Sequence, residues 1–191
     1  MADDIKSEKK RVRKALTQER LKELLHYDPE TGVFKWKQER RGGEFYSVVL
    51  VKVGDIAGSL RSGERGYRHW KIGVDGENYR AHRLAWFYMK GEWPKIIDHK
   101  DGDALNNRLS NLRLATDTQN LANAKKRVGP KIKSQFKGVS LMSSERKKPW
   151  IATISCNKKR RHLGYFATEV EAHAAYAKAA KELFGEYART E

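Results

Sequence analysis

Cysteine is nearly absent from this sequence of 191 residues, which contains only Cys156. A single cysteine cannot form an internal disulfide or supply a cysteine-rich zinc site. Long apolar runs are missing as well. The charged first residues lack the apolar segment of a signal peptide, and the most apolar stretch, residues 45–53, is far too short to span a bilayer. We therefore expect an intracellular, cytoplasmic protein.

Negative charge is also scarce. The sequence has 40 lysine and arginine residues against 24 acidic residues, which gives a formal net charge of +16. Such an excess favours a polyanionic partner. A basic protein of membrane surfaces would need a helix with lysines on one face and large apolar residues on the other. None of the predicted helices has that pattern, so we expect a nucleic-acid partner and no membrane, and no protein partner is evident.

The hydrophobic patterning predicts an α+β protein with small cores, since only 39% of the residues are apolar. Residues 1–14 have mixed charge without periodicity and are expected to form a disordered basic arm. Residues 39–66 have glycine-rich flanks and are interpreted as an extra hairpin that touches a minor groove. The other elements expected before residue 95 are a helix over 16–27 capped by Thr17, a strand over 33–37, a hairpin turning at Asp75-Gly76, and a helix over 81–90 closed by Gly91.

Residues 96–120, IIDHKDGDALNNRLSNLRLATDTQN, predict a strand, a loop, a second strand and the start of a helix. Asp98 ends the first strand, and Asn120 lies in the first helical turn. If the strand packs beside the helix start, the two side-chain oxygens can meet on one divalent cation, because Mg²⁺ prefers oxygen ligands. His99 points to the opposite side of the strand, and a histidine side chain is the usual residue to accept a proton from water near neutral pH. Asn111 is expected to cap unpaired backbone groups of the loop.

The same stretch carries a family resemblance. The pair DH, then NNRLSNLRLAT, then QN resemble the HNH endonucleases, the ββα-metal or His-Me finger nucleases. The closest likeness is to the homing-type branch of phages and introns, in which asparagine replaces the last histidine. The resemblance covers residues 67–124. It implies that Asp98 and Asn120 hold one metal ion, Mg²⁺ or Mn²⁺, that His99 is the general base, and that Asn111 orients the loop.

The C-terminal part predicts three short strands and one helix with a capping box at Thr168 and Glu171. The short sequence motifs KGV, WIATI and LGYF and the alanine-rich helix carry a family resemblance. Through them, this part resembles the plant ethylene-response-factor, or APETALA-type, DNA-binding domain. That resemblance implies a three-stranded antiparallel sheet with one packed helix, and a sheet that binds the DNA major groove. Core candidates are Leu163, Phe166, Tyr176, Leu183 and Phe184.

Basic side chains flank the strands and the junction between the two parts. Residues 125–134 have no period and are interpreted as a basic linker. Contacts to DNA are expected from eleven side chains: Arg108, Arg113, Lys125, Lys126, Arg127, Arg146, Lys148, Trp150, Lys158, Arg160 and Arg161.

The sequence thus predicts a two-part protein, with an HNH endonuclease domain at 15–124 and an APETALA-type domain at 135–191. The expected function is metal-dependent hydrolysis of double-stranded DNA by a phage homing-type enzyme, acting in the host cell. A sequence-specific regulator with an inactive nuclease fold is the main alternative. A recombinase is disfavoured because the chain is too short for a tyrosine-recombinase catalytic domain, and an RNA-binding or RNA-cutting protein stays open.

Overall fold

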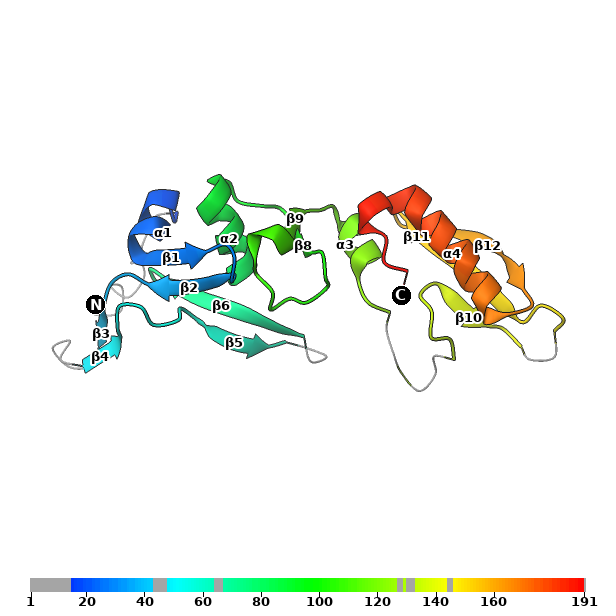
Figure 1. Ribbon diagram of the computed structural model, residues 1–191, viewed down its shortest axis with the longest axis horizontal. Coiled ribbons are helices and arrows are strands. Elements are labelled where there is room, and N and C mark those ends of the chain that lie inside the picture. The colour runs from blue at the N-terminus through cyan, green and yellow to red at the C-terminus, as the bar shows by residue number, and fades with distance from the viewer. Residues whose placement is uncertain are drawn as a thin grey trace, which may run out of the picture.

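The computed structural model describes residues 15–42, 48–63, 67–126, 129, 133–143 and 146–190. The protein is elongated, with an N-terminal lobe and a C-terminal lobe on either side of helix α3 (Figure 1). Within these ranges it is an α+β protein whose small sheets pair only antiparallel strands, as the sequence predicts. The predicted arm at 1–14 lies outside the described residues.

The N-terminal lobe packs one long helix and one short helix against short sheets. Its elements are α1 (Gln18–Leu24), β1 (Leu25–Asp28), β2 (Val33–Trp36), β3 (Arg40–Gly42), β4 (Val48–Val51), β5 (Ser59–Ser62), β6 (Arg68–Val74), β7 (Glu77–Arg80) and α2 (Ala81–Lys90). One expectation was wrong: the helix over 16–27 ends at Leu24. Leu25 and Tyr27 instead alternate with exposed His26 and pair with β2, where they bury both apolar side chains.

The hairpin predicted at Asp75-Gly76 is confirmed. Both residues have positive φ, 49° and 83°, which is the backbone of a tight primed turn between β6 and β7. The helix over 81–90 is also confirmed, and Gly91 closes it in the left-handed conformation. Residues 39–66 hold the β3–β4 pair, but they also supply β5, which extends the β6–β7 hairpin to three strands.

The stretch around residue 98 forms the predicted strand, loop, strand and helix. The elements are β8 (Ile97–His99), the 3₁₀ turn η3 (Leu109–Asn111), β9 (Leu112–Leu114) and α3 (Asp117–Asn123). Thr116 caps α3 by accepting a hydrogen bond from Gln119, whose side chain in turn caps the backbone of Thr116. The ββα unit expected from the HNH resemblance is therefore present.

The C-terminal lobe is a three-stranded antiparallel sheet covered by one helix. Its elements are β10 (Val139–Leu141), β11 (Trp150–Cys156), β12 (Lys159–Phe166), α4 (Glu169–Phe184) and η4 (Gly185–Tyr187). The predicted capping box at Thr168 and Glu171 is confirmed. Small residues let helix and sheet approach closely: a Cβ at Gly138 would collide with the Tyr176 ring. Tyr176 and Phe184 are buried as expected, whereas Leu183 is 40% exposed.

Helix α3 joins the two lobes. Its Ala122 is buried in one apolar cluster with Tyr176, Ala179 and Phe184 of α4.

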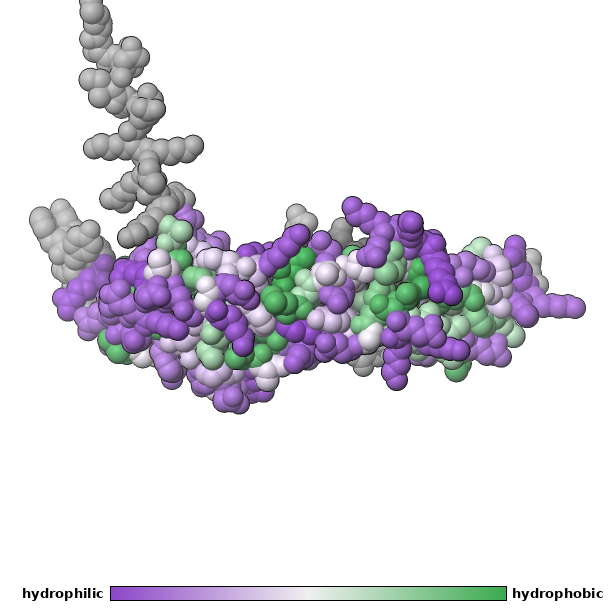
Figure 2. Space-filling model, turned by 90° about the horizontal axis from the view of Figure 1, so that it is seen from above, coloured by the Kyte–Doolittle hydropathy of each residue, from purple (hydrophilic) through white to green (hydrophobic). Residues whose placement is uncertain are grey.

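Figure 2 shows hydrophilic residues along the whole length of one face, interleaved with smaller apolar patches. None of the helices in the described part of the chain is both long and apolar enough to cross a membrane.

Candidate active site

Asp98 and His99 lie at the end of β8, beside a cavity of about 540 Å³. Both residues are buried, with exposures of 4% and 7%. Asn120, from α3, lines the same cavity together with basic side chains. The basic residues in that lining are Arg80, Arg83, Lys95 and Lys125. A carboxylate, an imidazole and an amide therefore share one recess with a positively charged rim, which suits an anionic ligand.

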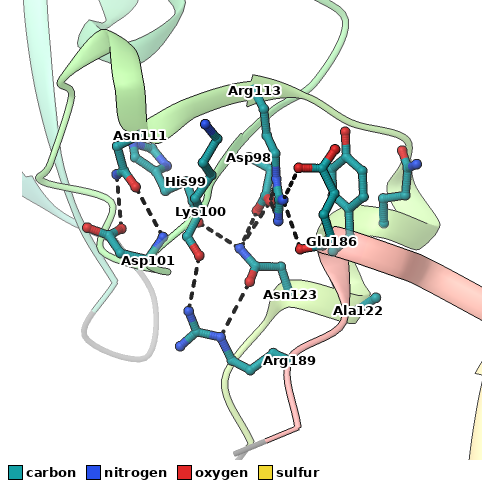
Figure 3. A network of polar contacts seen from close by, with 12 residues as sticks. Asp98, His99, Lys100, Asp101, Asn111, Arg113, Ala122, Asn123, Glu186 and Arg189 are labelled. Carbon is teal, nitrogen blue, oxygen red and sulfur yellow. Dashed lines mark hydrogen bonds and ion pairs between the residues drawn. The ribbon is translucent and has the colours of Figure 1, made fainter. Parts of the chain in front are cut away.

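The Asp98 carboxylate is held by two donors (Figure 3). Arg113 forms an ion pair with its Oδ2 at 2.8 Å, and the side-chain amide of Asn123 donates to both oxygens at 3.0 Å. The same amide donates to the carbonyl oxygen of His99 at 2.7 Å. Asn123 was not among the residues predicted from the sequence. Its position could have indicated a role at the site, because a residue three positions after Asn120 lies on the same side of the helix.

His99 is oriented by a neighbouring amide. Its Nε2 lies 3.3 Å from Oδ1 of Asn107, which is 2% exposed. An amide oxygen only accepts, and the nitrogen of this amide faces the carbonyl of Leu105. This contact therefore favours a proton on Nε2 and leaves the lone pair on Nδ1. The buried ring of His82 packs edge-on against His99, with centroids 5.1 Å apart.

Asn111 makes its contacts inside the loop, as its proposed bracing role requires. Its amide donates to Asp101 Oδ1 and to the carbonyl of Asn106, and its oxygen accepts from the backbone of Asp101. Burial by itself would raise the pKa of Asp101, but hydrogen bonds from Asp103, Asn106 and Asn111 outweigh burial and lower that pKa. The turn-like DGD sequence is thus a closed hydrogen-bonded unit next to His99.

The N-terminal hairpin supports this loop from behind. The Tyr27 hydroxyl donates to the carbonyl of Asn107 at 2.7 Å, and the backbone of Leu109 donates to Pro29. Gly32, with φ of 74°, lets the turn lie directly on the loop: a Cβ there would be 2.5 Å from the backbone of Asn107 and Arg108. The β1–β2 hairpin is therefore part of the framework that holds His99.

The buried His82 should make stability depend on pH. Burial, followed by electrostatic interactions with His99, Arg80 and Arg83, lowers the pKa of His82 to about 3. An unfolded histidine binds a proton below pH about 6.5, whereas folded His82 stays neutral, so stability is lost as pH falls through that range. We expect the unfolding free energy to fall by about 1.4 kcal/mol per pH unit below pH about 6.5 from this group. Denaturant titrations between pH 7 and pH 4 measure it.

A matched pair of variants isolates that effect. His82→Phe should flatten the acid-side loss, while His26→Ala, at an exposed position on β1, should follow the wild-type curve. An unchanged slope in His82→Phe would assign the acid sensitivity to other groups.

The predicted DNA-contacting residues differ in how they are placed. Arg108, Arg146, Lys148, Lys158, Arg160 and Arg161 are exposed, and Lys125 lies on the rim of the cavity. Lys126 donates to the carbonyl of Phe136. Arg127 lies outside the described residues.

Two other residues predicted to contact DNA have contacts inside the protein. Arg113 is 11% exposed and is used internally by Asp98 and by the ring of Tyr187. The Trp150 side chain lies on the face of the sheet that α4 covers, opposite to the face of Thr153. There it packs with Val139, Ala152 and Ala172. Both side chains therefore already have partners inside the protein, and the DNA surface proposed below is built without them.

A second cavity, of about 500 Å³, continues from the first toward the C-terminal lobe. The two cavities share Leu121, Ala124 and Lys125, and the second adds Lys126, Lys133 and Lys137. Lys137 donates to three carbonyls at the end of α3. Burial, with the charge of Arg189, lowers its pKa to about 8. A positively charged path thus runs from His99 to the C-terminal sheet.

The donor set suits one divalent ion. In the described ranges no group of three or more His, Cys, Asp or Glu residues converges, but the predicted site needs only one acid. Among the described residues, Oδ1 of Asp98 accepts a hydrogen bond only from the side-chain amide of Asn123. The side chain of Asn120 makes no hydrogen bond to another described residue. A carboxylate oxygen has more than one acceptor position, so both residues can still offer an oxygen to Mg²⁺ or Mn²⁺.

Known proteins resemble this part of the chain in sequence. The family description "HNH endonuclease" matches residues 79–122. One relative is L560 of Acanthamoeba polyphaga mimivirus, whose name marks it as an uncharacterized HNH endonuclease. It is 33% identical to this chain over 129 residues, which are 66% of this chain and 63% of the length of L560. Protein 3.8 of Escherichia phage T7 is 35% identical over 113 residues, which are 58% of this chain and 88% of the length of Protein 3.8.

A third relative is shorter in its match. YosQ of Bacillus subtilis, whose name assigns it to prophage-derived HNH homing endonucleases, is 40% identical over 63 residues, 32% of this chain and 35% of its own. The alignments therefore span less than two thirds of L560 and YosQ. Strands β8 and β9, helix α3 and the buried Asp98-His99 pair form the ββα arrangement expected from the HNH resemblance. The chain belongs to the HNH endonuclease family, whose relatives include phage and prophage proteins.

Proposed function

We propose that this protein is a metal-dependent DNA endonuclease of the homing type. The observation that carries the proposal is the shared recess of Asp98, His99 and Asn120 with its basic rim. When bound there, a divalent ion would polarise a phosphate and stabilise the charge that develops on the leaving oxygen. Asp98 and Asn120 are the proposed ligands, and the family likeness supports a DNA substrate.

In this proposal, His99 removes a proton from the attacking water through Nδ1. The Asn107 contact supports that assignment, because it holds the proton on Nε2 and fixes the plane of the ring. Arg83 and Lys95, at the rim, would bind the phosphates next to the scissile bond. The products would be a 5′-phosphate and a 3′-hydroxyl, as the family resemblance implies.

We further propose that the open face of the C-terminal sheet binds the major groove. Strand pairing puts Thr153 beside His162 and Ser155 beside Arg160, on the side of the sheet away from buried Ala152 and Ile154. Exposed basic residues extend this face at the β11–β12 turn and before β11. They are Arg146, Lys148, Lys158, Arg160 and Arg161. A sheet of this width fits a major groove.

Cleavage assays on supercoiled plasmid test the proposed activity. With Mg²⁺ or Mn²⁺ the protein should nick or linearise the plasmid, and a chelator should stop the reaction. DNA binding without cleavage under any metal would favour the alternative, a sequence-specific DNA-binding regulator with an inactive nuclease fold.

Affinity for DNA should depend steeply on salt. If about six phosphates are neutralised, the log of the association constant should fall against the log of the salt concentration with a slope near −5. Removing two sheet cations, as in a Lys158→Ala, Arg160→Ala double variant, should make that slope less steep by about 2 units. Fluorescence anisotropy with a duplex between 50 and 200 mM salt, roughly the range in which such slopes are resolved, measures both. An unchanged slope in the variant would place the DNA elsewhere.

A further inference from the structure

The end of the C-terminal lobe returns to the active site. Residues 186–189 follow helix α4, the first two of them within η4, and the C-terminal end of the chain lies beside α3 (Figure 1). The backbone of Arg189 donates to the carbonyl of Ala122 in α3 at 3.3 Å. Arg189 is only 9% exposed, although it is an arginine. Burial of this kind needs partners that accept its hydrogen bonds.

One group of contacts holds the arginine that pairs with Asp98. Arg113 donates to the backbone carbonyl of Glu186 at 3.0 Å and forms an ion pair with its carboxylate at 3.3 Å. The guanidinium lies 3.8 Å from the centre of the Tyr187 ring, and the Tyr187 hydroxyl donates to Leu114. The side chain that neutralises Asp98 is therefore fixed on its far side by the C-terminal lobe.

A second group of contacts orients the amide that faces Asp98. Arg189 Nε lies 3.4 Å from Oδ1 of Asn123, and Nη2 donates to the carbonyl of Lys100 at 3.3 Å (Figure 3). An asparagine has one accepting end and one donating end. Because the cation of Arg189 occupies the accepting end, the NH₂ group of Asn123 is turned toward Asp98 and the carbonyl of His99.

The contact with the loop is also close. A Cβ at Gly102 would lie 3.0 Å from the guanidinium of Arg189. Gly102 follows His99 by three residues, in the turn closed by Asp101 and Asn111. Arg189 thus touches both sides of the recess, the loop after β8 and the helix α3.

We propose that Arg189 is a positioning residue of the nuclease centre, supplied by the C-terminal lobe. It fixes the orientation of the Asn123 amide, and through that amide the carboxylate of Asp98. The inference rests on the proposed nuclease function. Its consequence is that the lobe proposed to bind the major groove also completes the cutting site, so cleavage requires the two lobes to be docked.

The test compares Arg189→Ala, Arg189→Lys and the control Lys181→Ala in the full chain. Lys181 is exposed on α4, so its variant removes one positive charge without touching the site. Single-turnover cleavage rate, duplex affinity and the Mg²⁺ concentration for half-maximal rate are measured at one salt concentration. We expect Arg189→Ala to cut at least about tenfold more slowly and to need more Mg²⁺, with duplex affinity within about twofold of wild type. Arg189→Lys should recover part of the rate, and Lys181→Ala all of it.

A double-mutant cycle separates positioning from general damage to the fold. Because Arg189 acts through Asn123, Arg189→Ala should slow an Asn123→Ala protein by less than about twofold. Equal slowing in both backgrounds, or an unchanged rate in Arg189→Ala, would overturn the inference while leaving the nuclease proposal in place. A wild-type protein that cuts no DNA with Mg²⁺ or Mn²⁺ would instead refute the proposed function itself.

Discussion

Replacing His99 with alanine is expected to abolish detectable cleavage and to leave DNA affinity nearly unchanged. A positioned general base contributes about 10² to 10⁴ in rate, and no other described imidazole or carboxylate shares the recess in a form that can replace it. His82, which packs against His99, has its pKa lowered to about 3 by burial and is fixed beneath the ring. Affinity should survive because the exposed basic residues of the DNA surface do not depend on His99.

The measurement is a single-turnover cleavage assay combined with a duplex-binding titration. His26→Ala is the matched control, since it removes an exposed histidine from the same lobe. If His99→Ala keeps more than about a tenth of the wild-type rate, another group must activate the water.

Replacing Asp98 with alanine should damage both cleavage and stability. The change removes a proposed metal ligand, and it leaves Arg113, which is 11% exposed, with only the carboxylate of Glu186 as its ion-pair partner. Breaking a buried ion pair from one side costs about 3–5 kcal/mol, because the remaining charge stays desolvated. We expect a loss of this order in the free energy of unfolding, measured by urea titration, together with complete loss of cleavage.

A paired replacement separates the two effects of Asp98. In an Asp98→Ala, Arg113→Met double variant no charge is left buried without a partner, so much of the stability should return while cleavage stays lost. Asp117→Asn, at an exposed position in the first turn of α3, controls for loss of an acid nearby. Recovery of cleavage in the double variant would show that Asp98 serves only to balance Arg113.

Features fixed by local chemistry were predictable from the sequence. Thr17 and Thr168 cap the helices expected at those positions, because a cap depends on residues within one turn. The primed turn at Asp75-Gly76 is set by two residues that tolerate positive φ. Strand β5 was not predictable in this way: its four residues are all exposed and show no alternation, so only pairing with β6 makes them a strand.

The candidate site was predictable only in part, for a similar reason. Asp98, His99 and Asn120 follow from spacing and family likeness, whereas Asn107, Asn123 and Arg189 act through contacts that join distant segments. Arg189 is 89 positions from Lys100, and no local pattern pairs them. The half-buried position of Trp150 could have been predicted from the alternation along its strand. Trp150 lies on the same side of β11 as Ala152 and Ile154, and that side faces α4.

The position of the metal ion relative to Asp98 and Asn120 tests the account most directly. Crystals of the protein with uncleaved duplex and Mn²⁺ would locate the ion by its anomalous scattering. The account predicts one ion at about 2.0–2.3 Å from an oxygen of each side chain, beside His99 and a DNA phosphate. An ion held away from Asp98, or a duplex bound with its phosphates outside the recess, would contradict it.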